Sequence, residues 1–533
     1  MLTHRPRTAL ATRFSRIGLA AVTAALVGSA LALNGAAAAH AADVPPAPRA
    51  TTTKVAFGTQ FHGTWAELSD DDKAKILDTV AAAGATWVRI DISWSMIQPK
   101  KGTFDTVWGV PQVDKAVQMA NARGLKVLGT FWLTPQWASG STNSRVLPTN
   151  VADYANAIKF AANRWAGQIQ AWEVWNEPNS SDFLSPVDPA AYTNLLKAAY
   201  PAVKAGSPSA LVMPGGTMYV DTPFINSVYA NGGKNFFDVM AVHPYQGKAD
   251  LPPDAPDTGG TQIQRLTHLD ALETLMAANG DGAKPIWMTE FGWSTHDNTA
   301  STPTWYLGVS EATQAVYLKQ SLEYIQANYP QITNAFWYTS RDLNVDGAYH
   351  QNNRGLIRRD FTPKPALQMV TCYVKGCQAD AWIQATGAGS AGASTLEVKT
   401  SKDSRYTRRA YLRLDTSTAL KHVSSAKLRM YVTSKDATTN VPVTAYPVAD
   451  NTWADTGLTW PGPALGAAGG TVTVGATGTY YDFDVTDAVN ADLTSDGIVS
   501  IALADPATAD VRVQFASLEA TNTATRPQLI LTP

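Results

Sequence analysis

The feature that most constrains the fold of this chain is a regular alternation of strand-like and helix-like segments between residues 54 and 370. The strand-like runs are rich in β-branched and aromatic residues, whereas the stretches between them carry apolar residues at helical spacing. We count eight such runs, at residues 55–61, 86–93, 125–132, 169–175, 210–214, 237–243, 285–291 and 333–339. Eight strands with interleaved helices predict a (β/α)8 TIM barrel of the α/β class, which places its functional side chains at the carboxyl ends of the strands.

The helical stretches carry the end signals expected of such a barrel. Residues 69–83 begin with Ser69 and three aspartates and stop before Gly84, and these residue types favour the two ends of a helix. Further helices are predicted at residues 153–165, 189–205, 266–278 and 311–327. A doubly wound sheet with a dinucleotide site is less favoured, because no Gly-x-Gly-x-x-Gly motif follows a strand.

The composition changes after Cys377. Thr, Val, Ser, Ala and Gly dominate, helical periodicity is lost, and short alternating runs occur at residues 395–399, 409–414, 426–432, 441–446, 480–485, 498–504, 511–515 and 528–531. This pattern is typical of an all-β sandwich. The sequence therefore predicts a barrel domain at residues 54–377 followed by a β-sandwich domain at residues 378–533.

The N-terminal segment has the pattern of a signal peptide. Four arginines precede the uncharged stretch 17–33, and the small residues that follow end in Ala39-His40-Ala41. We expect residues 1–41 to be removed, residues 42–53 to form a Pro- and Ala-rich linker, and the protein to be secreted to the extracellular space. The alternative is an uncleaved N-terminal anchor. No later stretch has the pattern of a membrane span.

Charge and cysteine content exclude several classes of protein. The chain has 42 basic and 44 acidic residues, and without residues 1–41 it has 38 and 44, so no strong positive charge attracts nucleic acid or anionic lipid. With two cysteines only, Cys372 and Cys377, neither a disulfide-built scaffold nor a multi-cysteine zinc site is possible. The two thiols close a small loop in an oxidising compartment or stay unpaired. We expect a monomer.

Two glutamates stand at the ends of predicted strands. Glu177 lies in the segment WEVWNEPN, residues 172–179, at the end of the fourth strand, and Glu290 lies in IWMTEFGW, residues 286–293, at the end of the seventh. Strands four and seven face one another across the mouth of a barrel. Acetal hydrolysis needs one carboxyl group to protonate the departing oxygen and another to attack the anomeric carbon. The alternative is that each glutamate is a surface acid in a strand-to-loop turn.

These two segments resemble the acid/base and nucleophile motifs of retaining clan A glycoside hydrolases, most closely family 39 and less closely family 5. The resemblance covers residues 54–370. It implies that Glu177 is the acid/base, Glu290 the nucleophile, and Asn176 the residue that contacts the sugar 2-hydroxyl. It also implies net retention of configuration, for which the carboxyl groups should lie about 5–5.5 Å apart rather than the roughly 6.5–9.5 Å of inverting enzymes.

The same resemblance implies substrate-binding roles for residues at other strand ends. His243 and Tyr245 resemble the family's His-x-Tyr element, which orients the nucleophile and the sugar. Trp337 resembles the tryptophan that forms a platform under the sugar at the cleavage point. His62, after the first strand, is a weaker candidate, as are two tryptophans after the third, Trp132 and Trp137.

Arg89 resembles the barrel arginine that lies near the nucleophile carboxylate. An equally good interpretation is a structural ion pair with Glu173 or Asp91 inside the barrel, and the two interpretations are compatible.

We expect no metal and no cofactor. Residues 342–347 begin like an EF-hand calcium loop, but the twelfth position is Asn353 instead of glutamate and the segment follows a strand. No His-Glu-x-x-His, Gly-x-Ser-x-Gly or phosphate-loop motif occurs, which disfavours zinc hydrolysis, serine hydrolysis and nucleotide chemistry.

Residues 378–533 resemble the DNRLRE-type β-sandwich of carbohydrate-binding module family 96. The resemblance is carried by ADAW at 379–382, TLEVK at 395–399, RRAYLRLD at 408–415, LTW at 458–460 and YDFDVT at 481–486. The closing motif departs from the family, because residues 515–520 read FASLEA. The resemblance implies binding to a glycan or cell surface, and the alternative is a stabilising or spacing module.

The sequence as a whole predicts a secreted retaining glycoside hydrolase that acts on a polysaccharide or oligosaccharide. Two alternatives stay open, a non-catalytic glycan-binding protein and a transglycosylase on the same scaffold. The sugar, the linkage and the choice of exo or endo action depend on loops such as 248–260 and 292–308, whose shape the sequence does not give.

Overall fold

A computed structural model describes residues 54–258, 262–343, 350–387, 390–416, 422–451, 453, 456–492 and 497–532. The predicted signal peptide and linker lie outside these residues. The predicted domain boundary falls between the last helix of the first part, α10 (Pro365–Lys375), and the first strand of the second, β10 (Ala379–Gln384). That boundary stays a prediction.

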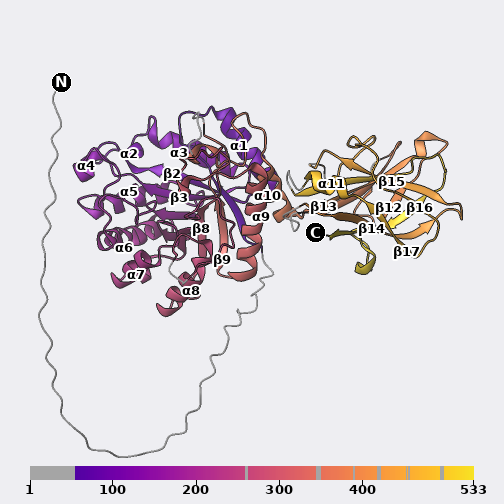
Figure 1. Ribbon diagram of the computed structural model, residues 1–533. Coiled ribbons are helices and arrows are strands. Elements are labelled where there is room, and N and C mark those ends of the chain that lie inside the picture. Colours follow the sequence, from indigo (N-terminus) through magenta and orange to yellow (C-terminus); the bar gives the residue numbers. More distant parts are fainter. Residues whose placement is uncertain are drawn as a thin grey trace, which may run out of the picture. The chain divides into compact units, whose positions relative to one another are not determined.

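Residues 54–375 form a curled parallel sheet surrounded by helices (Figure 1). Its strands pair in the order β5-β4-β3-β2-β1-β9-β8-β7-β6, and each neighbouring pair in this order is parallel. The strands are β1 (Ala56–Gln60), β2 (Trp87–Ser93), β3 (Lys126–Trp132), β4 (Ala171–Val174), β5 (Leu211–Pro214), β6 (Thr217–Met218), β7 (Met240–His243), β8 (Ile286–Phe291) and β9 (Ile332–Trp337). Seven of the eight predicted runs contain one of these strands, the eighth, at residues 333–339, overlaps β9 but begins one residue later, and β6 is additional.

The two edges of this sheet, β5 and β6, are consecutive in the chain and separated only by Gly215 and Gly216. A side chain at Gly215 would place its Cβ atom 2.7 Å from the backbone oxygen of Trp175, and one at Gly216 would lie 2.6 Å from Thr289 Oγ1. Glycine is therefore required at both positions. One broken segment pairs with β4 on one side and with β7 on the other, and the predicted (β/α)8 barrel is confirmed.

Helices follow the strands as the end signals predict. In α1 (Asp70–Ala83), the Ser69 side chain accepts a hydrogen bond from the backbone of Asp72, and Gly84 takes the left-handed conformation at φ 104°. The other helices are α2 (Trp94–Ile97), α3 (Gly109–Asn121), α4 (Gln136–Ser139), α5 (Val151–Arg164), α6 (Pro189–Gly206), α7 (Thr222–Ala230), α8 (Leu269–Ala278) and α9 (Glu311–Asn328). Short 3-10 helices occur at Lys234–Phe236, Leu266–His268, Thr304–Tyr306 and His350–Asn353.

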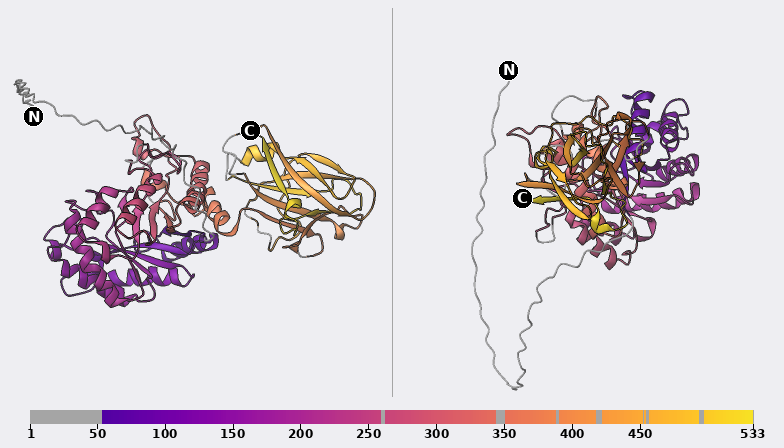
Figure 2. Two further views of the ribbon diagram at one scale, coloured as in Figure 1. Left: turned by 90° about the horizontal axis from the view of Figure 1, so that it is seen from below. Right: turned by 90° about the vertical axis from the view of Figure 1, so that its right-hand side faces the viewer.

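Residues 379–532 form two antiparallel sheets, as predicted for a β-sandwich (Figure 2). The first sheet has the order β11-β10-β13-β18-β15-β16, and the second has the order β12-β19-β14-β17 with β20 paired to β14. Beyond β10, the strands are β11 (Ser390–Ala391), β12 (Thr395–Val398), β13 (Arg408–Asp415), β14 (Ser425–Lys435), β15 (Val441–Val448), β16 (Thr471–Val474), β17 (Thr479–Asp484), β18 (Ile498–Ala504), β19 (Val513–Ala516) and β20 (Gln528–Thr532). One helix, α11 (Thr486–Asp492), and two 3-10 turns, Ser404–Tyr406 and Thr523–Thr525, complete this part.

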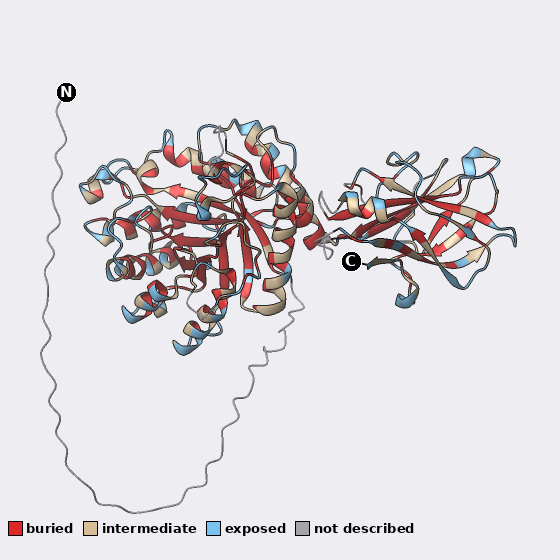
Figure 3. Cartoon of the chain, viewed as in Figure 1, coloured by how far each residue is buried: buried red, intermediate tan, exposed pale blue. Residues whose placement is uncertain are grey.

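Both parts have cores of their own, drawn red in Figure 3. In the sandwich, Leu412 and Ile501 of the first sheet and Leu428, Phe483 and Phe515 of the second belong to one buried cluster. Cys372 and Cys377 are both buried and are not joined by a disulfide bond. Among the described helices, none combines the length and the apolar character needed to cross a membrane.

Candidate active site

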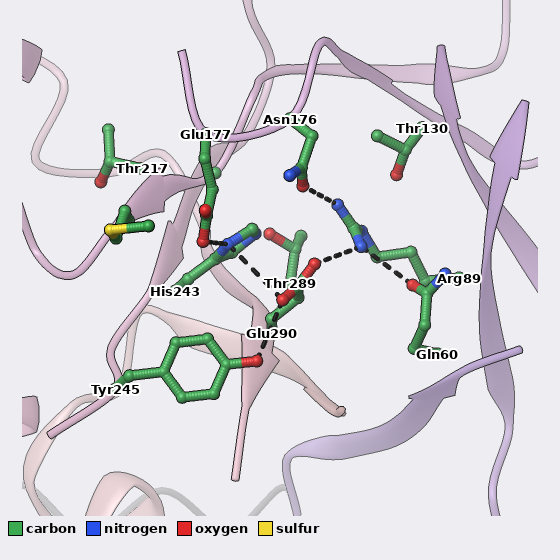
Figure 4. Close-up of polar contacts among 12 residues, drawn as sticks. Gln60, Arg89, Thr130, Asn176, Glu177, Thr217, His243, Tyr245, Thr289 and Glu290 are labelled. Atoms are coloured by element: carbon green, nitrogen blue, oxygen red, sulfur yellow. Dashed lines mark hydrogen bonds and ion pairs between the residues drawn. The ribbon is translucent and has the colours of Figure 1, made fainter. Parts of the chain in front are cut away.

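Two buried glutamates meet at the carboxyl ends of barrel strands. Glu177 follows β4 and is 4% exposed, and Glu290 is the fifth residue of β8 and is 8% exposed. Figure 4 shows both carboxyl groups turned toward His243, the last residue of β7. One carboxyl oxygen of each glutamate and one ring nitrogen of the histidine lie within 4.8 Å of one another. The structure thus brings together the two glutamates that stand 113 positions apart in the sequence.

The chain after β4 adopts an unusual backbone conformation that delivers Glu177. Trp175 and Glu177 both have positive φ angles, 77° and 41°. Such angles cost about 1–3 kcal/mol per residue outside glycine, so the surroundings must enforce them. Here the backbone N–H of Trp175 donates to Phe131 (3.0 Å), and that of Glu177 donates to Gly216 (3.1 Å). The neighbouring strand β3 and the glycine break between β5 and β6 therefore hold the glutamate in place.

Arg89 of β2 lies below the two glutamates and forms hydrogen bonds to several residues of the site. Its side chain is 1% exposed and donates through Nη1 to Glu290 (2.6 Å), through Nη2 to Asn176 (2.7 Å) and through Nε to Glu173 (2.7 Å). Gln60 accepts a further bond from Nη1 at 2.9 Å. Arg89 therefore forms the structural ion pair with Glu173 and also contacts the carboxylate of Glu290. Asp91 is hydrogen-bonded by Gln60 and not by Arg89.

Glu173 is a fully buried carboxylate whose oxygens are all occupied. Besides Arg89, it accepts bonds from the hydroxyls of Thr130 (2.7 Å) and Thr289 (2.8 Å) and from the backbone N–H of Gly216 (3.0 Å). Burial favours its neutral form, but the Arg89 charge and these donors outweigh burial and hold its pKa below the ordinary value. Glu173 stays ionised and fixes Arg89 in turn.

The partners of the two site glutamates differ. Burial raises the pKa of Glu177, the charge of Glu290 raises it further, and a hydrogen bond from His243 Nδ1 (2.8 Å) opposes the rise. Burial also raises the pKa of Glu290, but there the Arg89 guanidinium and the Tyr245 hydroxyl (3.0 Å) favour the charged form. Because only Glu290 touches a permanent cation, a proton shared by the pair resides on Glu177.

A cavity of about 580 Å³ opens over these groups. Glu177, Glu290, Asn176, Tyr245 and His62 line it, as expected of site residues. Its walls are largely aromatic and also include Trp65, Trp132, Phe183, Tyr219, Trp305, Tyr306 and Tyr338. Aromatic planes suit the apolar C–H faces of sugar rings, so the cavity has the chemistry of a glycan site.

Four predicted substrate-binding residues do not line this cavity, and one of them is the weaker candidate Trp137, whose indole donates to the backbone oxygen of Gln98 (2.9 Å). Arg89 lies below it, and His243 bonds Glu177 while its Nδ1 stays 3.8 Å from Glu290. Trp337 is fully buried, where its indole donates to the backbone of Arg354 (2.8 Å) and packs against Phe291. The expectation that Trp337 contacts the sugar is therefore not met.

The aromatic residue exposed to the cavity at this point is Tyr338, directly after β9. Successive side chains along an extended chain point to opposite faces, so a shift of one residue exchanges the buried and exposed aromatic rings. The motif WYTS at residues 337–340 contained both rings, and the sequence alone did not distinguish them.

His62 lines the cavity as an uncharged ring. It stacks on Trp65 with ring centroids 3.9 Å apart, and neither ring nitrogen has a hydrogen-bond partner. Burial, followed by the nearby Arg89 charge, lowers the pKa of His62 to about 3. Its role is therefore that of a neutral wall residue at ordinary pH.

Several residues in or directly below the cavity were not predicted from the sequence, among them Gln60, Tyr219, Tyr338 and Arg354. Gln60 carried a usable signal, because it ends β1 as Glu177 follows β4. Arg354 carried none, since it lies in the connection after β9 and reaches the site only through the path of that loop.

Among the described residues, one group of histidine and carboxylate side chains has the spacing of a metal site, and it consists of Glu177, His243 and Glu290. The Arg89 cation on Glu290 does not fit a divalent ion in that position. The segment that begins like a calcium loop lies mainly outside the described residues, but its first aspartate, Asp342, is bonded to Lys364 (2.9 Å) and to the backbone of Gly355 (2.7 Å).

Comparison with known proteins agrees with this geometry. Residues 49–341, more than half of the chain, match the family model described as Cellulase (glycosyl hydrolase family 5), and residues 374–533 match that of carbohydrate-binding module family 96. An endo-1,4-beta-xylanase from Gibberella zeae is 28% identical over 133 residues, which are 24% of this chain and 36% of the xylanase. The matched part thus spans little more than a third of that relative.

Solved structures share the fold. A family 39 glycoside hydrolase from Bacteroides cellulosilyticus WH2 aligns with a TM-score of 0.51 at 21% identity, over 84% of this chain and 80% of that protein. A family 39 enzyme from Xanthomonas axonopodis pv. citri aligns with a TM-score of 0.52 at 16% identity, over 86% and 95%. The resemblance to both families, and to the carbohydrate-binding module, is confirmed at the level of the fold and the family models.

Proposed function

Since this chain belongs to the cellulase family of glycosyl hydrolases, family 5, we propose that it hydrolyses O-glycosidic bonds of a polysaccharide or oligosaccharide with retention at the anomeric carbon. Glu177 acts as the acid/base and Glu290 as the nucleophile. The observation that carries this proposal is the approach of a Glu177 oxygen to a Glu290 oxygen within 4.8 Å. Such an approach between single oxygens is compatible with the roughly 5–5.5 Å between the carboxyl groups of a retaining pair, whereas an inverting pair is separated by roughly 6.5–9.5 Å to leave room for a water molecule.

In the first step Glu290 attacks the anomeric carbon as the bond from that carbon to the leaving oxygen breaks. The proton of Glu177 goes to the leaving oxygen, and the sugar becomes ester-linked to Glu290. Arg89 and the Tyr245 hydroxyl hold the two oxygens of the attacking carboxylate, so it enters the reaction ionised and oriented.

In the second step Glu177 removes a proton from water, whose oxygen replaces Glu290 on the anomeric carbon. The change of role follows from the charges. Burial still raises the pKa of Glu177, but while Glu290 is ester-linked it bears no negative charge, so its contribution to the raised pKa is lost and the deprotonated form is more favoured than before. His243 bonds Glu177 in both states, because an imidazole nitrogen either donates or accepts according to its tautomer.

The rest of the chain fits an extracellular role. Residues 1–41 direct secretion and are removed, and the matched carbohydrate-binding module holds the enzyme on a glycan, which raises the local substrate concentration. The mature protein acts as a monomer without a cofactor.

The test is release of reducing ends by purified residues 42–533 and by Glu290→Gln, over plant, fungal and bacterial polysaccharides. Beta-1,4-xylan belongs in the panel, because a matched relative is an endo-1,4-beta-xylanase. We expect turnover in the wild type, loss in the variant, and β-to-β or α-to-α product configuration by NMR of the first-formed sugar. Equal activity of both proteins would contradict the assignment of Glu290 as the nucleophile. A product of inverted configuration would contradict the retaining mechanism.

A further inference from the structure

Among the described residues, Arg354 is a buried cation on the cavity wall that no carboxylate contacts, although its charge favours the ionised form of Glu290 at longer range. Its side chain is 7% exposed, and the guanidinium lies 4.7 Å from the centre of the Tyr245 ring. Nη1 donates to the backbone oxygen of Gly292 (2.9 Å), and Nε has no hydrogen-bond partner. In the part of the chain that the structure describes, no carboxylate forms an ion pair with this side chain.

Two other buried cations of the barrel have carboxylate partners. Arg89 contacts two glutamates, and Lys364 contacts Asp342 at 2.9 Å. A buried charge is costly unless an opposite charge and hydrogen bonds compensate it. The aromatic ring and the single carbonyl beside Arg354 supply part of that compensation. Nη2 makes no hydrogen bond to a described residue and is left for a bound molecule, whereas Nε is buried away from the cavity.

The position of Arg354 relates it to the reacting sugar. Tyr245, on which the guanidinium stacks, donates its hydroxyl to Glu290, and Gly292 follows Glu290 by two residues. One aromatic ring thus separates the guanidinium from the nucleophile. The nearby imidazoles of His296 and His350 supply no negative charge, and they stay uncharged because burial, with the Arg354 charge, lowers the pKa of both.

We propose that the sugar ring bound beside Glu290 carries a carboxylate and that Arg354 pairs with it, so that the substrate is a glycan containing uronic acid. This inference rests on the proposed function, because it names the substrate class of the same site. A planar guanidinium matches a carboxylate with two parallel hydrogen bonds. A neutral sugar leaves the buried Arg354 side chain without an anionic partner, which provides discrimination against neutral sugars.

The test is equilibrium binding of monosaccharides to the wild-type mature chain by titration calorimetry. Free monosaccharides have no glycosidic bond, so no inactive variant is needed. Glucuronate, galacturonate and mannuronate are each compared with the neutral parent sugar. We expect one uronate to bind about tenfold or more tightly than its parent, as typical of a hydrogen-bonded charge pair.

Matched variants assign the preference to the cavity. Arg354→Gln should abolish it, and Arg354→Lys, which keeps the charge but loses the planar fork, should keep part of it. Arg145→Gln is the control, because this exposed arginine also lines the cavity but donates to the backbone of Asp182. It should leave the preference intact. Thermal unfolding of each variant shows whether it is folded.

Three results would overturn the inference: equal binding of uronates and parent sugars, absence of uronate binding, or a preference that survives in folded Arg354→Gln. The proposed function is judged separately, because hydrolysis of any glycan that is lost in Glu290→Gln supports it whether or not uronates are preferred.

Discussion

In the proposed mechanism, a single proton distinguishes the roles of Glu177 and Glu290. Both carboxyl groups are buried, but Arg89 touches only Glu290, and the charge of Glu290 in turn favours the protonated form of Glu177. Two chemically identical side chains thereby become an acid and a nucleophile through their neighbours alone.

Replacing the acid tests this division. In Glu177→Gln, hydrolysis of natural glycans should fall about 10²–10⁴-fold, because the leaving oxygen gains no proton. Aryl glycosides with acidic leaving groups need no such help, so their first step should be nearly unaffected. The measurement is the burst rate with a dinitrophenyl glycoside, which reports the first step, and the steady-state rate on the natural glycan, each compared between Glu177→Gln and the wild type. A uniform loss on both substrates would assign Glu177 another role.

The same residue should set the alkaline limb of the pH profile. Burial raises the pKa of Glu177, so the acid form persists above the usual range of glutamate, and kcat/KM should decline only when pH passes this raised value. In Glu177→Gln the alkaline limb should disappear for activated aryl glycosides, while the acidic limb from Glu290 remains. An alkaline limb of unchanged position in the variant would point to a different acid.

His62 should affect stability rather than catalysis in acid. The folded pKa of about 3 lies below the ordinary 6.5, so below pH 6.5 the unfolded chain binds a proton that the folded chain does not. The free energy of unfolding therefore falls between about pH 6.5 and pH 3 and is fully retained above that window. Urea denaturation of His62→Gln and wild type at pH 7 and pH 4.5 should show a smaller acid-induced loss in the variant. Parallel losses would mean that His62 is protonated in the folded state.

At the scale of elements, the break between β5 and β6 joins the barrel to the site. Gly215 and Gly216 let one segment pair with both β4 and β7, and the Gly216 backbone bonds Glu173 and Glu177. The two glycines thus close the sheet, and the backbone of Gly216 also holds Glu173 and Glu177 in position.

A methyl group at Gly216 should damage the site more than the fold. Its Cβ would collide with the His243 ring and lie 2.6 Å from Thr289 Oγ1, so Gly216→Ala must displace the histidine that bonds Glu177. We expect kcat to fall at least about tenfold, since small misplacements of reacting groups are costly. Gly387→Ala, where a Cβ meets nothing within 4 Å, is the control. Wild-type kcat in Gly216→Ala would show that His243 position is unimportant.

At the scale of the whole molecule, two folds of different class follow one another in the chain. The barrel carries the buried acid pair, and the sandwich matches a carbohydrate-binding module. Binding to a polymer raises the effective concentration of an attached enzyme without changing its chemistry.

Removing the β-sandwich should therefore lower the activity on insoluble substrates more than the activity on soluble ones. A chain of residues 42–377 should keep its rate on soluble oligosaccharides and lose activity on insoluble polysaccharide, because only the latter holds the enzyme through the module. Reducing-end assays on matched soluble and insoluble forms of one glycan provide the measurement, with the sandwich added in trans as the control. Proportional losses on both forms would favour a stabilising role for residues 378–533.

The sequence by itself determined the eight strand segments, the caps of α1 and the placement of Glu177 and Glu290 at strand ends. These features depend on side-chain periodicity and on residues a few positions apart, and both can be recognised in the amino-acid sequence. Which partner each side chain meets was decided only by tertiary structure. His243 bonds Glu177 instead of Glu290, Tyr338 replaces Trp337 in the cavity, and Arg354 reaches Tyr245 from a distant loop. Such contacts depend on the register between strands and on loop paths, where a shift of one residue exchanges the side chain that faces the cavity.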